Sequence, residues 1–231
     1  MTHHAPLGRR LFAEYLGSAL LSAVVIGSGI AAQQLSPGDV GVELLENALA
    51  TAGGLYVLIV MLQPVSGAHF NPVVSFVDAA LGGVTWRDAW AYLAAQVAGC
   101  ITGAVGANVM FARATVAWST HHRASGPHLF SEVIATAVLL VVIFALARNG
   151  RHASTPAAVG AYIGAAYFFT SSTSFANPAI TVGRMFSNTF AGIAPASAPG
   201  FIGAQLLGGV LAIAAITTLY PKDVTHDIAA P

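Results

Sequence analysis

Two short stretches of this sequence are near copies of each other. Residues 66–73 read SGAHFNPV and residues 171–179 read SSTSFANPA, so in each an Asn-Pro pair follows a run of small, mostly polar residues. Asn is a favoured helix N-cap, and Pro suits the first helical position because it has no N–H to leave unpaired. Each pair therefore predicts that a helix starts at its proline.

Both predicted helices are too short to cross a lipid bilayer. The apolar segments Val73–Leu81 and Ala179–Phe186 contain nine and eight residues, whereas a membrane span needs about 20. We interpret them as half-helices that start deep in a membrane and are entered by extended, non-helical chain. Such backbone survives at that depth only if it is buried in protein or lines water, so its carbonyl groups would line a pore.

The composition also indicates a membrane protein. Of 231 residues, 56% are hydrophobic and only 8% are charged, against roughly 25% charged in a soluble domain. Nine basic residues balance nine acidic ones, which argues against a nucleic-acid partner. The single cysteine, Cys100, excludes an internal disulfide and a cysteine-built metal site. We expect no metal, no cofactor and no catalytic residues, and we expect the lipid bilayer as a partner.

Six apolar stretches are long enough to span. They are Leu11–Ala32, Asn47–Val65, Ala89–Phe111, Leu129–Leu146, Ser154–Thr170 and Gly200–Tyr220. Basic residues are concentrated on one side of this arrangement, while the Asp39–Glu46 loop on the other side has none. This asymmetry predicts that both termini are cytoplasmic.

Three pairs of residues recur in the same order along the chain: Glu14 with Glu132, the two Asn-Pro pairs, and Gln96 with Gln205. We interpret the chain as a single channel domain over residues 1–231, built from two repeats, approximately 9–111 and 128–220. Each repeat has three spans, an odd number, so the second must be inverted relative to the first. The predicted fold class is therefore an all-α membrane protein, with six transmembrane helices and two re-entrant half-helices in two inverted repeats.

Inverted repeats of this kind place their function at the membrane midplane. There the positive amino ends of two half-helices would face each other and repel cations, and the asparagine amides would donate hydrogen bonds to a passing oxygen. The predicted midplane residues are Asn71, Pro72, Val73, Asn177, Pro178 and Ala179. The predicted pore-lining backbone comprises Gly67, Ala68, His69, Ser172 and Thr173.

The paired Asn-Pro motifs and the helices that carry Glu14 and Glu132 resemble the aquaporin/aquaglyceroporin (major intrinsic protein) family over about residues 9–220. The resemblance implies the aquaporin fold and a homotetramer with one pore per subunit. It also implies a non-enzymatic, passive channel for water and small neutral solutes. Glu14 and Glu132 would be structural carboxylates that hold the re-entrant loops. The residues alone leave a proton-relay role for these two groups open.

The chain departs from the family pattern after the second motif, where Ile180 stands in place of the usual arginine. Counting from the motifs, the resemblance assigns the selectivity constriction to Thr51, Ala165, Ser174 and Ile180. This ring would be wide and would carry no fixed charge. Arg184 follows Ile180 by one helical turn. We interpret it as lining the outer vestibule, with a snorkelling surface arginine as the alternative.

A valine in the first motif and the missing arginine resemble a bacterial subgroup associated with arsenic-resistance operons. The resemblance implies an inner-membrane channel for water, glycerol-sized polyols and arsenite or other neutral metalloids. One alternative is a water-selective or general solute channel without a metalloid role. Another is an ion-coupled secondary transporter, which would need a coupling-ion site, and we identify no Asp, Glu or Lys near the Asn-Pro motifs. His121, His122 and His128 form a loop cluster that is either solvated, metal-binding or pH-sensing.

Overall fold

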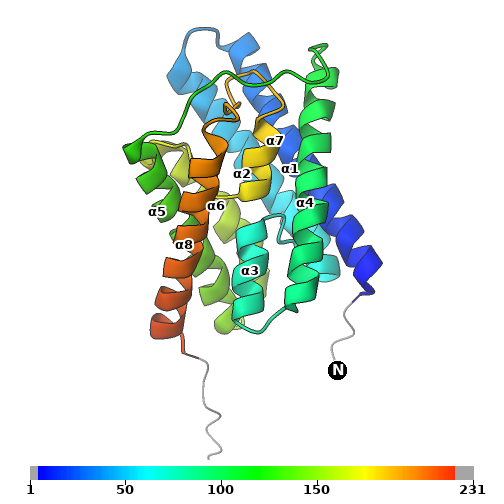
Figure 1. Ribbon diagram of the computed structural model, residues 1–231, viewed down its shortest axis with the longest axis vertical. Coiled ribbons are helices and arrows are strands. Elements are labelled where there is room, and N and C mark those ends of the chain that lie inside the picture. Colours follow the sequence, from blue (N-terminus) through cyan, green and yellow to red (C-terminus); the bar gives the residue numbers. More distant parts are fainter. Residues whose placement is uncertain (1–4, 222–231) are drawn as a thin grey trace, which may run out of the picture.

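The computed structural model describes residues 5–221, and in that part every regular element is a helix (Figure 1). The helices are α1 (Leu7–Leu35), α2 (Val40–Ser66), α3 (Pro72–Ala80), α4 (Trp86–Met110), α5 (Gly126–Arg148), the 3₁₀ turn η1 (His152–Ser154), α6 (Thr155–Phe169), α7 (Pro178–Arg184) and α8 (Ala198–Leu219).

The predicted all-α membrane fold is confirmed. Within the described part, α1, α2, α4, α5 and α8 are long and apolar enough to cross a bilayer. The sixth predicted span is α6, whose 15 residues rise only about 22 Å at 1.5 Å per residue. The turn η1 precedes it directly. It ends at Phe169 because the chain then leaves the helix to approach the second Asn-Pro motif.

Helix α2 begins earlier than predicted. The segment Asp39–Glu46, predicted as a loop, is helical from Val40 onward. Asp39 is its N-cap, and the Asp39 side chain accepts a hydrogen bond from the Val42 N–H at 3.1 Å. The apolar pattern alone missed this start because the first two turns of α2 carry Glu43 and Glu46.

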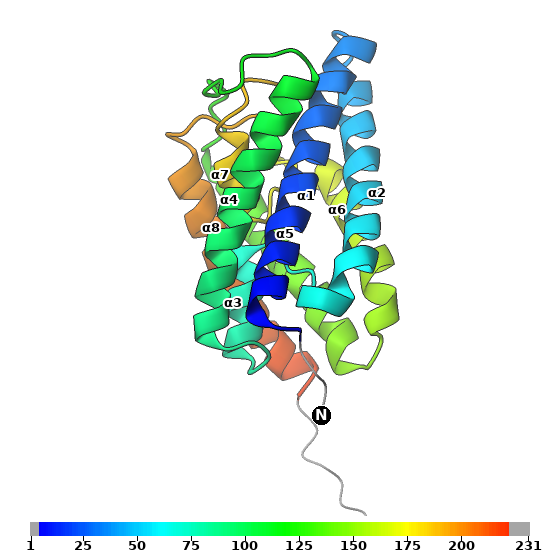
Figure 2. The ribbon, with the colours of Figure 1, turned by 90° about the vertical axis from the view of Figure 1, so that its right-hand side faces the viewer.

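The chain runs through the same series of elements twice: a long helix, a second helix, a half-helix and a further long helix. Half-helices α3 and α7 enter from opposite ends of the bundle, and their amino ends face each other in its middle (Figure 1). The start of α1 and the end of α8 lie at one end of the bundle, which we call the terminal end (Figure 2). The opposite end carries residues 111–125 and 185–197, and we call it the loop end (Figure 1).

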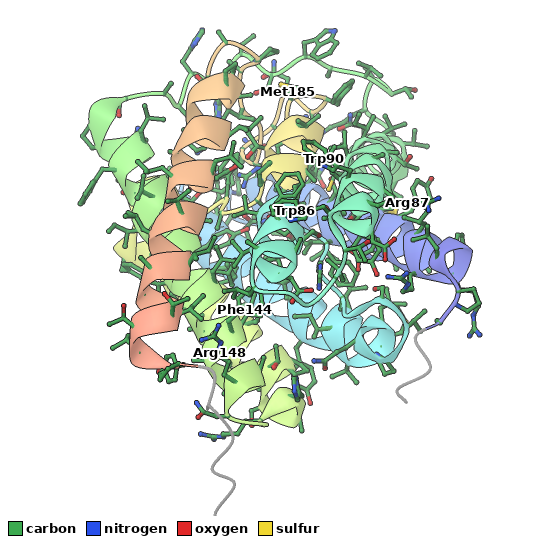
Figure 3. The ribbon with its side chains drawn as sticks, turned by 60° about the horizontal axis from the view of Figure 1, so that its bottom comes forward. Trp86, Arg87, Trp90, Phe144, Arg148 and Met185 are labelled. Carbon is green, nitrogen blue, oxygen red and sulfur yellow. The ribbon has the colours of Figure 1, made fainter. Side chains whose placement is uncertain are left out.

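Aromatic and basic side chains fix the elements at the terminal end (Figure 3). Phe76 of α3 packs against Trp86 and Trp90 of α4, with ring centroids 6.3 and 4.9 Å apart. Both tryptophans are more than half exposed, as is usual where a helix meets the membrane–water boundary. Arg148, at the end of α5, donates to the carbonyl oxygens of Ile216 and Tyr220 in the last turn of α8.

Small residues allow the long helices to cross closely. A Cβ atom added at Gly103 of α4 would clash with the carbonyl oxygen of Ala19 in α1, and one added at Gly99 would clash with that of Tyr15. Gly208 of α8 meets α5 in the same way, since an added Cβ would lie 2.7 Å from the Val133 oxygen. Close backbone approach of this kind is a main source of helix association in membranes.

We predict that Gly103→Ala lowers the free energy of unfolding in detergent micelles by about 1–3 kcal/mol, because the added methyl group forces α1 and α4 apart. The matched control is Gly106→Ala on the same helix, where an added Cβ meets no atom within 4 Å. Thermal unfolding followed by circular dichroism measures both. Equal stability of the two variants would contradict the close α1–α4 contact.

Candidate functional site

The two Asn-Pro motifs meet at the centre of the bundle and bind each other. The Nδ2 of Asn71 donates to the carbonyl oxygen of Ala176 at 2.7 Å, and the Nδ2 of Asn177 donates to that of Phe70 at 2.8 Å. Each half-helix is therefore tied to the re-entrant segment of the other. A side-chain amide has two N–H donors, so one donor on each asparagine is left after this contact.

The same two side chains also start the half-helices. The Oδ1 of Asn71 accepts from the Val73 N–H at 3.0 Å, and the Oδ1 of Asn177 accepts from the N–H groups of Ala179 and Ile180 at 2.9 and 3.2 Å. These are N-cap contacts, which satisfy amide groups that a helix leaves unpaired. As a result, both asparagine oxygens point at helix backbone and both nitrogens point away from it.

The re-entrant segments are not simply extended chain, as the sequence had suggested. Ala68 and Phe70 have φ angles of 54° and 49°, and their counterparts Ser174 and Ala176 have 50° and 49°. Side chains other than glycine rarely adopt this left-handed region, at a cost of roughly 1–3 kcal/mol each. Gly67 and Thr173, directly before Ala68 and Ser174, also have positive φ angles, of 91° and 61°. Each segment therefore has two successive left-handed residues and a third just before its asparagine, and something outside it must hold this conformation.

Two buried carboxylates hold these segments. Glu14 accepts hydrogen bonds from the N–H groups of His69 and Phe70 at 3.0 and 2.7 Å, and Glu132 accepts from those of Phe175 and Ala176, both at 2.9 Å. Both carboxylates are fully buried. Their oxygens are occupied by backbone donors, which supports a structural role and leaves little capacity for proton relay.

The repeat-mate glutamines complete each carboxylate site. The Nε2 of Gln96 donates to Glu14 at 2.8 Å, and the Nε2 of Gln205 donates to Glu132 at 2.6 Å. The Ser66 hydroxyl adds a further donor to Glu14 at 2.6 Å. A buried carboxylate is tolerable when several donors replace its lost water. The two sites, on opposite halves of the chain, share the two backbone donors and the glutamine, and the Glu14 site has the serine in addition.

We predict that Glu132→Gln lowers the free energy of unfolding by about 1–3 kcal/mol, because an amide nitrogen would then face the buried N–H groups that donate to this carboxylate. Solute flux should fall with it, since the segment before Asn177 loses its support. The matched control is Glu46→Gln, because within residues 5–221 the Glu46 carboxylate accepts from the Ser36 hydroxyl alone, at 3.0 Å. Flux and stability equal to the wild type would contradict the structural role of Glu132.

A cavity of about 520 Å³ runs along the asparagine meeting point. Of the predicted site residues, those that line it are Thr51, Gly67, Ala68, His69, Asn71, Ser174, Asn177, Ile180 and Arg184. Pro72, Val73, Pro178 and Ala179 are instead buried in the first turns of α3 and α7. Ser172 and Thr173, predicted as pore-lining, are outside the lining set. The Ser172 hydroxyl instead accepts from the Ser174 N–H at 3.2 Å.

The placement of Ala165 in the constriction is wrong. Helix α6 lines the cavity with Thr155, Val159, Ile163 and Tyr167, which recur every fourth residue. Ala165 is two positions away, about 200° around the helix, and it is exposed. Counting back from the motif failed because the chain between α6 and Asn177 is not helical. A residue count across it therefore does not fix which side of α6 a residue faces.

On this part of α6 the residue that lines the cavity is Tyr167. It is 3% exposed, and its hydroxyl lies 3.0 Å from the hydroxyl of Thr51 across the α2–α6 interface. An aromatic ring therefore stands where the sequence predicted a methyl group. The four-residue spacing from Thr155 was the signal that could have identified it.

Arg184 does not lie on the surface. It is 3% exposed, it lines the cavity, and its Nε donates to the carbonyl oxygen of Ala191. Its Cζ atom lies 3.4 Å from the ring centroid of Phe175, which is a cation–π contact. This placement agrees with the vestibule interpretation of Arg184 and not with the snorkelling alternative, and it adds a charged group to the cavity wall beyond the predicted ring of small residues.

Asp78 of α3 also lines the cavity, toward the terminal end. The statement that no acidic residue lies near the motifs is therefore wrong. Its Oδ2 lies 3.9 Å from the Nε2 of His69 and accepts from the Val84 N–H at 2.9 Å. The residue was missed because it is six positions after the first proline, on a half-helix whose inward face the sequence did not define.

The three loop histidines are not gathered into one site. The Nδ1 of His128 lies 2.6 Å from the Ser125 hydroxyl at the start of α5. Partial desolvation, and then the charges of Arg123 and Arg184, lower the pKa of His121. Over residues 5–221, no group of three or more His, Cys, Asp or Glu side chains is placed to hold a metal ion.

We predict that Tyr167→Ala increases the flux of glycerol-sized solutes relative to water, because it removes an aromatic ring from the cavity wall. Ala165→Val, on the opposite face of α6, should leave both fluxes unchanged. Stopped-flow light scattering on proteoliposomes measures the two rates. An effect of Ala165→Val with none of Tyr167→Ala would restore the original placement of the constriction.

Known proteins share this arrangement. Residues 1–176 match the family model described as major intrinsic protein. The chain is 49% identical to the aquaglyceroporin AqpS of Rhizobium meliloti over 90% of its length and 88% of that protein. It is 30% identical to the lens fiber major intrinsic protein of Gallus gallus, over 68% of this chain and 59% of that one.

A solved structure has the same fold. The X-ray structure of the aquaglyceroporin from Plasmodium falciparum matches with a TM-score of 0.73 at 19% identity, over 93% of this chain and 97% of that one. At this identity the match concerns the fold alone. Taken with the two crossed motifs, the sequence matches show that the chain belongs to the major intrinsic protein family.

Proposed function

We propose that this protein is a passive channel for small uncharged solutes: water, glycerol-sized polyols, and arsenite or other neutral metalloid acids. The observation that carries the proposal is the reciprocal asparagine contact beside a cavity of about 520 Å³. There the amino ends of α3 and α7 face each other and one amide donor on each asparagine remains free. A neutral hydroxylated solute can accept these donors, whereas a cation meets two positive helix ends.

The wall near the loop end suits solutes with one apolar and one polar side. Ile180 and the Tyr167 ring are apolar, whereas the Thr51 hydroxyl and the Arg184 guanidinium are polar. Glycerol and arsenous acid each carry three hydroxyl groups on a compact core, so both could use this division. We propose that Thr51, Tyr167, Ser174 and Ile180 form the constriction and that Arg184 lines the vestibule beside it.

The name of the relative AqpS, an aquaglyceroporin, supports polyol-sized permeants, and the isoleucine after the second motif supports the metalloid assignment. We further propose two inverted repeats, a homotetramer, an inner-membrane location and cytoplasmic termini. The start of α1 and the end of α8 lie at one end of the bundle, which supports an even number of spans (Figure 2).

One observation favours a second candidate, an ion-coupled transporter. The carboxylate of Asp78 lines the cavity beside His69 and could bind a coupling proton. A transporter would show saturable, pH-driven flux that Asp78→Asn abolishes. A channel would show linear flux down a concentration gradient, and Asp78→Asn would leave it running.

The proposed function is tested by stopped-flow measurements of water, glycerol and arsenite entry into proteoliposomes. We expect all three to enter faster than into empty vesicles, in proportion to their gradients. Ile180→Arg should reduce glycerol and arsenite entry more than water entry, because a longer charged side chain at this position would narrow the cavity. Lack of arsenite entry above empty vesicles would remove the metalloid role, and lack of any entry would remove the channel function.

A further inference from the structure

Two arginines from different segments contact the same aromatic ring at the loop end. The Cζ of Arg184 lies 3.4 Å from the centroid of Phe175, and that of Arg123 lies 5.5 Å from it. Within residues 5–221, neither guanidinium has a carboxylate within 4.0 Å. Both cations are instead held by backbone carbonyl groups and by the face of the ring, so their positive charge is not cancelled by an ion pair.

Phe175 itself is fixed on two sides. Its N–H donates to Glu132 at 2.9 Å, and its ring packs edge-on against Phe201 with the centroids 5.1 Å apart. It is 5% exposed and lines the cavity. The ring is thus rigidly attached to the segment that ends in Asn177, and it presents a fixed surface to the two guanidiniums.

The two arginines differ in what their remaining donors do. Arg123 donates from Nε and Nη2 to the carbonyl oxygens of Gly192 and Phe190, both at 2.7 Å, and it is outside the cavity lining. Arg184 donates only from Nε, to Ala191. Its Nη groups have no protein acceptor in the described part of the chain, and the residue lines the cavity while being 3% exposed. Arg184 therefore brings unpaired donors to the cavity wall.

We propose that Phe175 is a positioning residue for selectivity: its ring holds the Arg184 guanidinium against the cavity wall, where that charge excludes cations and leaves neutral solutes free to pass. This inference rests on the proposed channel function. The positive charge is thus held in place by Phe175. It does not come from the residue after the second motif, which here is the uncharged Ile180. An aromatic face attracts a guanidinium more strongly when both are desolvated, as they are at this site.

The experiment compares Phe175→Leu, which keeps an apolar side chain of similar size but removes the aromatic face, with Phe175→Tyr, which keeps that face. Arg184→Gln removes the charge itself, and Arg123→Gln is the matched control because Arg123 lies outside the cavity lining. Each variant is reconstituted in liposomes. Sodium permeability is measured with a membrane-impermeant sodium dye inside the vesicles, and glycerol entry is measured in the same preparations by light scattering.

We expect Arg184→Gln to raise sodium permeability about tenfold or more, Phe175→Leu to raise it in the same direction, and Phe175→Tyr and Arg123→Gln to stay at the wild-type level. Glycerol entry should persist in both Phe175 variants and in Arg123→Gln, which shows that those pores are folded. The positioning role would be overturned if Phe175→Leu had wild-type sodium permeability with glycerol entry intact. It would also be overturned if Phe175→Leu and Phe175→Tyr had equally raised sodium permeability. Lack of glycerol entry in the wild type would instead contradict the proposed function.

Discussion

The structure depends on one constraint: backbone that leaves a helix inside a membrane must find its hydrogen-bond partners within the protein. Here the chain leaves the helix twice, before Asn71 and before Asn177. Each asparagine supplies an acceptor to its own half-helix and a donor to the segment of the other half. Neither segment is satisfied without the other, so the meeting point in the middle of the bundle is also what joins the two halves.

The buried glutamates are a consequence of the same constraint. Left-handed residues such as Phe70 and Ala176 direct successive N–H groups toward one side, where a carboxylate can accept two of them at once. Glu14 and Glu132 fill that role from α1 and α5, and Gln96 and Gln205 add the remaining donors. Carbonyl oxygens are thereby left for the opposite asparagine and for the cavity. The hydrogen bonds of this network offset both the backbone strain of the segment and the cost of burying a carboxylate.

The sequence predicted the parts of this fold that leave a pattern in a single segment. Asn-Pro pairs identified both half-helices to within a residue at their starts, and apolar length identified the spans. Contacts between segments were harder to foresee. Ala165 was placed by counting residues along a chain that changes from helix to turn. Such a count does not show which side of the helix a residue faces. The sequence left two alternatives for Arg184, the vestibule and the surface, because nothing in its own helix shows that the ring of Phe175 lies beneath it.

The central claim is that each asparagine both caps its half-helix and joins it to the other half. Thermal unfolding of Asn177→Ser and Asn177→Ala tests it most directly, because serine keeps the N-cap acceptor but is too short to reach the Phe70 carbonyl. The account predicts two separate losses of stability, with wild type above Asn177→Ser and Asn177→Ser above Asn177→Ala. A serine variant as stable as the wild type would contradict the contact between the halves, and one no more stable than alanine would contradict the cap.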